Sequence, residues 1–251
     1  MSNPSDSTPA VSSNAVANLR LERLARSTKP FMARGSRLQR CEGCRLAVTH
    51  CFCAWRPRMT SRSGACLIMH DVEPLKPSNT GWLIADVVTD SFAFTWSRTA
   101  VEEKLLALLG DPQWQPYLVF PAEYAAPGRG VEEVMPEEGR RPLFVLLDAT
   151  WTEARKMFRK SPYLDHLPVL SLTPEAHSRY RLRRSTRSEH LCTAEVAALC
   201  LDLAGDDRAA SALDAYLDVF SERYLDAKHN RPADTDSSAH RQLEPFLPNR
   251  R

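Results

Sequence analysis

The amino-acid sequence predicts an α/β protein in which helices flank a mainly parallel sheet. Short apolar runs alternate along the chain with amphipathic segments of helical period, as in successive β-α-β units. The runs at 116–121 and 142–148 are apolar almost throughout, which is typical of strands covered on both faces. The chain has 251 residues and 43% hydrophobic content, enough to bury a substantial core.

Runs of strand length follow one another through the middle of the chain. Where such a run is short and bounded by turn-forming residues, it indicates a strand rather than a helix. The predicted strands lie at 65–69, 92–96, 116–121, 142–148, 168–172 and 179–183.

The segments that follow the strands predict helices with recognisable first turns. Thr99 with Glu102, and Thr150 with Glu153, match the capping box, in which two side chains satisfy N–H groups at a helix start. The predicted helices span 78–88, 101–109, 151–160, 189–204 and 207–227.

The two ends of the chain have low hydrophobicity and predict disordered tails at 1–18 and 230–251. Between them, a basic segment at 19–62 carries four cysteines, and an α/β catalytic domain is expected at 63–229. The N-terminus lacks a signal-peptide pattern, and no apolar run reaches the roughly 18 residues of a membrane span. We therefore expect a cytoplasmic protein with no membrane partner.

Positive charge is clustered although the net charge is only +2. Arginines and lysines gather between Arg20 and Arg62, and again between Arg179 and Arg187. Such clusters can bind phosphates even when the net charge is small. An ordinary solvated surface is the alternative.

The spacing C-x2-C-x6-C-x-C predicts a structural metal site. Two close pairs of thiolates can surround one ion, and Zn²⁺ is the usual metal in closed four-thiolate sites. The alternatives are unrelated thiols, or His50 as a substitute ligand; Cys66, Cys192 and Cys200 are expected to pack in the core. The predicted zinc ligands are Cys41, Cys44, Cys51 and Cys53.

Two strand-to-helix loops carry polar residues where α/β proteins bind ligands. His70 follows the strand at 65–69, and Lys76 and Asn79 precede the next helix. Ser78 or Asn79 can cap that helix. The loop is not a phosphate loop, because the pattern G-x-x-x-x-G-K-[ST] is absent.

The second loop is D-A-T-W at 148–151. At the end of a strand, Asp148 can stay hydrated or meet a ligand rather than being buried without a partner. A purely structural turn, in which Thr150 caps the helix, is the alternative.

Six sequence blocks together resemble the DTW-domain family of tRNA-uridine aminocarboxypropyltransferases, which are related to the SPOUT methyltransferases. The resemblance covers roughly residues 38 to 225. It implies a SPOUT-like fold, a type that includes knotted backbones. The blocks are the cysteine cluster at 41–53, KPSNTGWLIAD at 76–86, VFPAEYA at 119–125, DATW at 148–151, SRYRLR at 178–183 and CTAEVA at 192–197.

The resemblance also implies a reaction. S-adenosyl-L-methionine donates its 3-amino-3-carboxypropyl group to N3 of a tRNA uridine, and 5'-methylthioadenosine is released. Asp148 is expected to act as general base or to position the uridine, and Trp151 to pack on the donor or on the flipped base.

Further site residues follow from the resemblance at the level of loops. The donor site is expected to include Phe120, Pro121, Asp148, Thr150, Trp151, Leu170, Ser171, Leu172 and Thr193. The tRNA site is expected to include His70, Lys76, Asn79, Arg179, Arg181 and Arg183, with the basic cysteine-bearing segment also binding phosphates. The alternatives are a SPOUT-type RNA methyltransferase using the same donor, a non-enzymatic zinc-containing RNA-binding protein and a small-molecule α/β enzyme.

Overall fold

The computed structural model describes residues 14–28, 38–172 and 191–248. Its helices are α1 (Ala15–Ala25), α2 (Gly81–Val87), α3 (Glu103–Gly110), α4 (Trp151–Arg159), α6 (Thr193–Leu203), α7 (Asp207–Lys228) and α8 (Ser238–Leu243). Its strands are β1 (Gly64–Met69), β2 (Ser91–Thr95), β3 (Trp114–Val119), β4 (Gly130–Val131), β5 (Arg141–Asp148) and β6 (Val169–Leu170).

The strands form one six-stranded sheet in the order β2-β1-β5-β3-β6-β4, and every pairing in it is parallel. The predicted α/β fold class is therefore confirmed. Met69 pairs with Asp148 at the ends of their strands, so the carboxyl ends of β1 and β5 lie at the same sheet edge. The strand predicted at 179–183 lies outside the described residues, and the two-residue β4 is too short to leave a sequence pattern.

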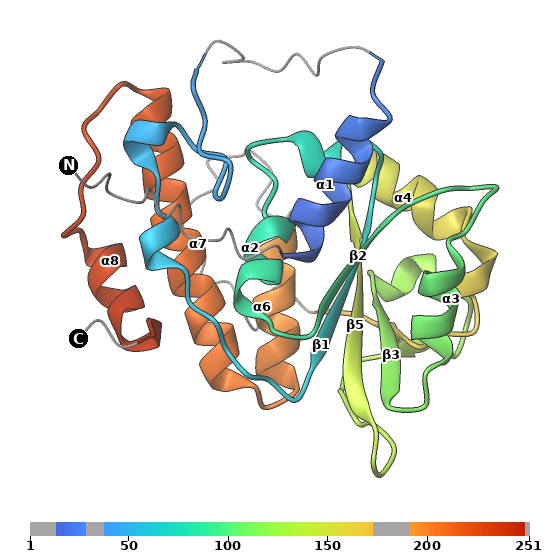
Figure 1. Ribbon diagram of the computed structural model, residues 1–251. Helices are drawn as coiled ribbons and strands as arrows, with labels where there is room; N and C mark the ends of the chain where they lie inside the picture. Colours follow the sequence, from blue (N-terminus) through green and yellow to red (C-terminus); the bar gives the residue numbers. More distant parts are fainter. Residues whose placement is uncertain (1–13, 29–37, 173–190, 249–251) are drawn as a thin grey trace, which may run out of the picture.

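Helices cover both faces of the sheet, with α2, α6 and α7 on one side and α3 and α4 on the other (Figure 1). Successive side chains of β1 alternate between two cores. Leu67 packs in the core under α2, α6 and α7, whereas Ile68 packs in the core under α3 and α4. This alternation explains why the strands are apolar on both faces. Within the described ranges, no helix has both the length and the apolar character needed to span a membrane.

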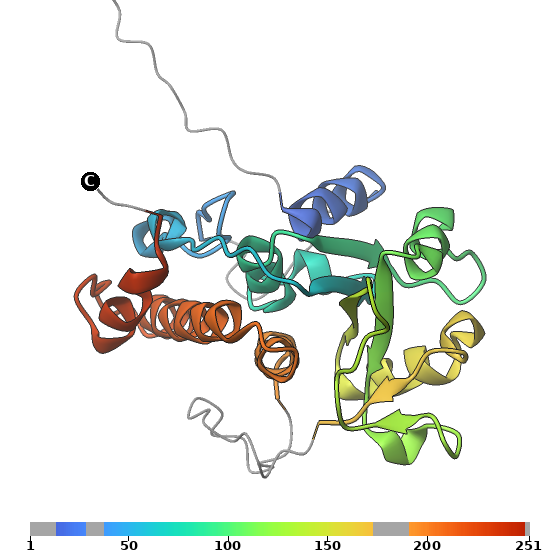
Figure 2. The same ribbon diagram turned by 90° about the horizontal axis from the view of Figure 1, so that it is seen from below.

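The predictions of disordered tails are wrong where the structure describes these segments. Helix α1 starts at Ala15, and Val16 is fully buried. Helix α8 lies beside α7 (Figure 2) and buries His240 and Leu243. The average hydrophobicity of both segments is low, but a few side chains of each helix are buried and hold the helix against the rest of the fold. Residues 1–13 and 249–251 lie outside the described residues.

Helix starts follow the predicted capping residues in two cases. The Glu153 carboxylate accepts the backbone N–H of Thr150 at 3.0 Å, which confirms that capping box. The Asn79 side chain accepts the N–H of Trp82 at 3.2 Å and so caps α2.

The predicted Thr99 and Glu102 box is wrong. Helix α3 begins at Glu103, and the Glu102 carboxylate instead accepts the N–H of Thr95 at 3.2 Å. The Glu102 side chain thus contacts the end of β2 instead of capping the helix next to it. Helix α6 also begins later than predicted, at Thr193, with Cys192 as its N-cap.

A buried carboxylate, Asp86, ties distant parts of the chain together. Asn14 donates to it at 2.7 Å and the Tyr216 hydroxyl at 3.0 Å, while Arg56 lies 3.1 Å from the same carboxylate. Burial raises the pKa of Asp86 to about 6 although these partners oppose the shift. Because an unpaired charge here would be costly, Asp86 keeps its partners close and so fixes the positions of α1, α2, α7 and the cysteine-bearing segment relative to one another.

Replacing Asn14 by Ala should destabilise the protein, because Asn14 both caps α1 and donates to Asp86. We expect the free energy of unfolding to fall by about 1–3 kcal/mol, as measured by urea denaturation. Asn18, which is exposed on the same helix, provides the matched control. Equal effects of Asn14→Ala and Asn18→Ala would contradict this role for Asn14.

Candidate active site and metal centre

Asp148 is the centre of a hydrogen-bonded cluster at the carboxyl edge of the sheet. The Asn79 amide donates to Oδ2 at 2.7 Å, and the Thr193 hydroxyl donates to Oδ1 at 2.7 Å. The three residues come from the loop before α2, the end of β5 and the first turn of α6. Of the two alternatives for Asp148, hydration or contact with a ligand, hydration does not hold, because Asp148 is only 3% exposed; its carboxylate is buried with hydrogen-bond partners.

The Asp148 carboxylate also packs directly against Gly81. A Cβ atom on Gly81 would lie 2.5 Å from Oδ2 of Asp148, so no larger residue fits without displacing the carboxylate. Burial raises the pKa of Asp148 to about 6, and the hydrogen bonds from Asn79 and Thr193 oppose this rise. The carboxylate is therefore tightly positioned by its surroundings.

An aromatic cluster lies on the other side of the D-A-T-W turn. The Trp151 ring stacks on Phe120, with centroids 5.4 Å apart and an interplanar angle of 11°. Tyr124 meets Trp151 edge-on at 5.9 Å, and Phe158 supports Phe120 from below at 4.5 Å. Trp151 is 37% exposed, so the cluster offers an aromatic surface beside the turn. The site prediction omitted Tyr124, although it lies within the VFPAEYA block.

The structure brings the predicted donor loops together at this edge. The N–H of Phe120 donates to the Leu170 carbonyl at 3.2 Å, and the N–H of Ala122 donates to the Ser171 hydroxyl at 3.1 Å. Pro121 lies between these two contacts. The Leu170 side chain is fully buried, and Leu172 packs against the core. Leu170 can therefore contribute only its backbone to a ligand site.

The predicted tRNA residues have mixed environments. The N–H of His70 donates to the Asp148 carbonyl at 3.0 Å, and its ring stacks on Trp96 at a centroid distance of 6.0 Å. Lys76 forms an ion pair with Glu73. Asn79 is buried and bonded to Asp148, and its contact with tRNA stays a prediction. The predicted Arg179, Arg181 and Arg183 lie outside the described residues.

Several arginines of the basic segment are engaged inside the protein. Arg23 pairs with Asp71 at 2.6 Å. Arg45 donates to the Pro74 carbonyl at 2.8 Å and lies 4.8 Å above the Trp82 ring. Arg56 pairs with the buried Asp86. These three arginines hold the segment to the fold, and the binding of phosphates by the segment stays a prediction.

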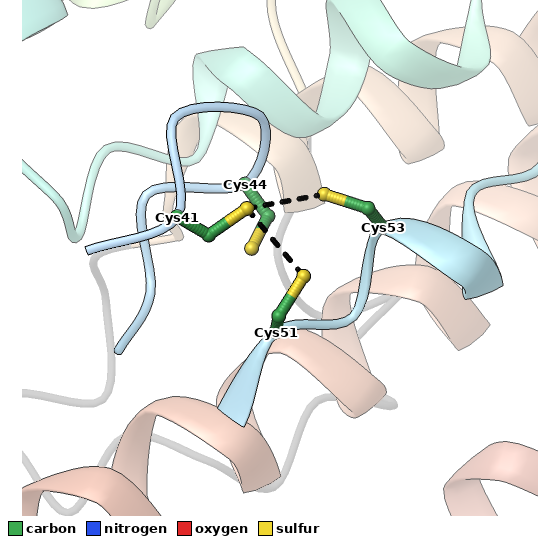
Figure 3. A group of neighbouring side chains, drawn as sticks. All are labelled: Cys41, Cys44, Cys51 and Cys53. Atoms are coloured by element: carbon green, nitrogen blue, oxygen red, sulfur yellow. Dashed lines mark hydrogen bonds between the residues drawn. The ribbon is translucent and has the colours of Figure 1, made fainter. Parts of the chain in front are cut away.

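The four predicted zinc ligands converge as expected (Figure 3). All four sulfur atoms lie within 4.8 Å of one another, and Cys41 Sγ is 3.6 Å from Cys53 Sγ and 3.4 Å from Cys51 Sγ. Tetrahedral zinc with bonds of about 2.3 Å requires sulfur separations of about 3.8 Å. The geometry therefore fits a closed zinc site that could hold the ion.

The loop between the first two cysteines is shaped around the sulfur atoms. A Cβ on Gly43 would lie 2.9 Å from Cys53 Sγ, and Arg45 takes a positive φ of 66° as its N–H bonds the Cys41 carbonyl. A hydrogen bond from Cys53 lowers the pKa of Cys44, which favours the thiolate that a metal binds. Cys66 and Cys200 pack in the core as predicted.

The purified protein should contain about one zinc ion per chain, because the cluster presents four thiolates. We expect Cys44→Ser to lose the metal and to unfold at lower urea concentration, since neighbouring Phe52 packs on Tyr216 of α7 at 5.1 Å. The matched control is Cys200→Ala, which removes a core thiol. Elemental analysis that finds zinc in Cys44→Ser, or none in the wild type, would contradict the zinc site.

Asp148→Asn should change how stability depends on pH. Because the folded-state pKa of Asp148 is raised from 3.8 to about 6, its contribution is fully present below pH 3.8 and is lost as the pH rises through about 6. Asparagine has no carboxyl group to ionise, so the stability of the variant does not fall over this pH range for this reason. The unfolding free energy of the variant, relative to the wild type, should therefore rise by on the order of 2 kcal/mol between about pH 4 and about pH 7.

Urea denaturation across that pH range measures the difference. Asp202→Asn on the exposed surface of α6 is the control, and its difference from the wild type should stay nearly constant. A constant difference for Asp148→Asn as well would mean that burial does not perturb this carboxyl group.

Comparison with known proteins places this site in a family. The model of the DTW domain matches residues 38–225. The curated tRNA-uridine aminocarboxypropyltransferase 2 of Drosophila melanogaster is 28% identical in an alignment of 175 residues that covers 66% of this chain and 66% of that relative. The match thus covers slightly less than two thirds of the relative's length. No solved structure matches the chain. The family match spans both the cysteine cluster and the D-A-T-W turn, and the protein belongs to the DTW domain family.

Proposed function

We propose that this protein transfers the 3-amino-3-carboxypropyl group of S-adenosyl-L-methionine to N3 of a uridine in tRNA. The observation that carries the proposal is the convergence at one sheet edge of the D-A-T-W turn, the loops after β3 and β6, and the start of α6. Membership of the DTW domain family and the name of the Drosophila relative support it.

The sulfonium of the donor makes three attached carbons electrophilic, so the orientation of the donor decides which group is transferred. Transfer of the aminocarboxypropyl group forms a bond from uridine N3 to the γ-carbon, and the sulfur departs in 5'-methylthioadenosine. The bond between the sulfonium sulfur and the γ-carbon breaks as the new bond forms, and the N3 proton passes to solvent water. The protein must therefore hold the donor and the uridine so that N3, the γ-carbon and the departing sulfur lie in line.

The aromatic cluster suits the planar groups of both partners. Trp151 and Tyr124 present ring surface at the sheet edge, while Phe120 and Phe158 lie behind and hold the Trp151 ring in place. Aromatic side chains of this kind stack on adenine or on an unstacked uracil. Trp151 is thus assigned to binding a planar base.

Asp148 is assigned to positioning rather than to direct proton transfer. Both of its oxygens already accept hydrogen bonds, and the residue is 3% exposed. Through those bonds, it sets the distance between the start of α2 and the start of α6. Thr193 is half-buried, so it is the member of the cluster that can also face the donor.

The reaction can be tested by incubating the protein with S-adenosyl-L-methionine and unmodified tRNA. Mass spectrometry of the digested tRNA should find 3-(3-amino-3-carboxypropyl)uridine, together with an equal amount of 5'-methylthioadenosine. Methylated tRNA with S-adenosylhomocysteine would instead show a methyltransferase of related fold. Binding of tRNA without either product would indicate a non-enzymatic RNA-binding protein.

Gly81→Ala tests the role of the positioned carboxylate in the same assay. The added Cβ would displace the Asp148 carboxylate, so we expect kcat/KM to fall at least about tenfold, which corresponds to about 1.4 kcal/mol. Gly110→Ala is the matched control, because a Cβ there meets no atom within 4 Å. Equal activities of the two folded variants would contradict the positioning role of Asp148.

A further inference from the structure

Helix α4 has one buried and one exposed side. Ala154, Met157 and Phe158 pack in the core beneath it. Its outer side and its C-cap residue, Lys160, carry four cations, which we call the basic face of α4; Arg155 is half-buried and the others are exposed. They are Arg155, Lys156, Arg159 and Lys160.

Among the described residues, no carboxylate pairs with any cation of the basic face. The acidic residue of α4, Glu153, caps the first turn beside Thr150. Two other arginines, by contrast, bind partners within the fold. Arg141 pairs with Asp90 and covers the Trp114 ring, and Arg129 donates to main-chain carbonyl groups. In the part of the chain that the structure describes, the basic face differs from these arginines because it has no carboxylate partner, and Arg159 donates only to the Arg155 carbonyl of its own helix, at 3.3 Å.

The basic face also begins at the site. Trp151, the first residue of α4, is the exposed ring of the aromatic cluster. The helix has nine residues, so at about 1.5 Å per residue it extends roughly 13 Å. Figures 1 and 2 show α4 in the outer layer of the molecule, on the side of the sheet opposite α6 and α7. A strand of RNA whose base reaches Trp151 can therefore continue along this surface.

We propose that the basic face of α4 binds the sugar-phosphate backbone of tRNA next to the target uridine. This inference rests on the proposed function, since it takes the nucleotide at Trp151 to belong to tRNA. Unpaired cations favour phosphates, and the release of counterions makes such binding strongly dependent on salt. Cations near a helix C-terminus also stabilise the helix by interacting with its dipole. A loss of stability in a variant would therefore not identify an RNA site, and RNA binding is the decisive measurement.

The test compares two double variants of equal charge by fluorescence anisotropy with an in vitro transcribed, labelled tRNA. The first is Arg155→Gln with Arg159→Gln on the basic face. The control is Lys228→Gln with Arg241→Gln; both residues are exposed and lie in the last turn of α7 and on α8, on the side of the sheet opposite α4. Each variant is also assayed for transfer with tRNA and S-adenosyl-L-methionine varied separately.

For the basic-face variant, we expect at least tenfold weaker tRNA binding. The slope of log K against log salt is negative, and it should become less steep by about 1.4–1.8, which corresponds to the loss of two phosphate contacts. The KM for tRNA should rise, whereas kcat at saturating tRNA and the KM for S-adenosyl-L-methionine should stay within about twofold. The control variant should bind like the wild type.

The outcomes separate this proposal from the proposed function. If both variants bind tRNA like the wild type, or lose affinity equally, the basic face is not the RNA surface, while transfer by the wild type would still support the enzyme. If the wild type binds tRNA without transferring the group, the proposed reaction fails and the binding comparison still decides the role of α4. If the wild type binds no tRNA, both proposals are overturned.

Discussion

The buried carboxylate of Asp148 is the constraint on which the site depends. A carboxylate with 3% exposure is costly unless it is hydrogen-bonded, and Asn79 and Thr193 supply those bonds. Gly81 leaves just enough room for it. Because the donors come from the starts of α2 and α6, one buried group determines how two helices meet the end of β5.

A second buried carboxylate, Asp86, does the same for the outer parts of the fold. It joins Asn14 of the first helix, Tyr216 of α7 and Arg56 next to the cysteine cluster. The cysteine-bearing segment is therefore attached through side-chain bonds and through packing of Phe52 on α7. Zinc in the cluster would stabilise this attachment, and in this way would support α2 and the loop before it without touching a substrate.

The two faces of the sheet contribute different chemistry to its carboxyl edge. The side that carries α2 and α6 provides the buried polar cluster around Asp148. The side that carries α4 provides the aromatic rings around Trp151 and then the basic face. The D-A-T-W turn passes from one to the other, which explains why an acid and a large aromatic residue lie only three positions apart. The proposed reaction between a charged donor and an RNA base would use both environments side by side.

By itself, the sequence determined the strand and helix alternation, the parallel sheet and the cysteine cluster, because local periodicity and ligand spacing encode them. The capping box of Thr150 and Glu153 was equally local. Only the tertiary structure decided that Asp148 is buried, that Asn79 faces it, and that Arg45 and Arg56 point inward. It also overrode the predicted α3 cap and ordered α1 and α8. The reason is physical: burial and pairing depend on partners that are dozens of residues away, and no local pattern records them.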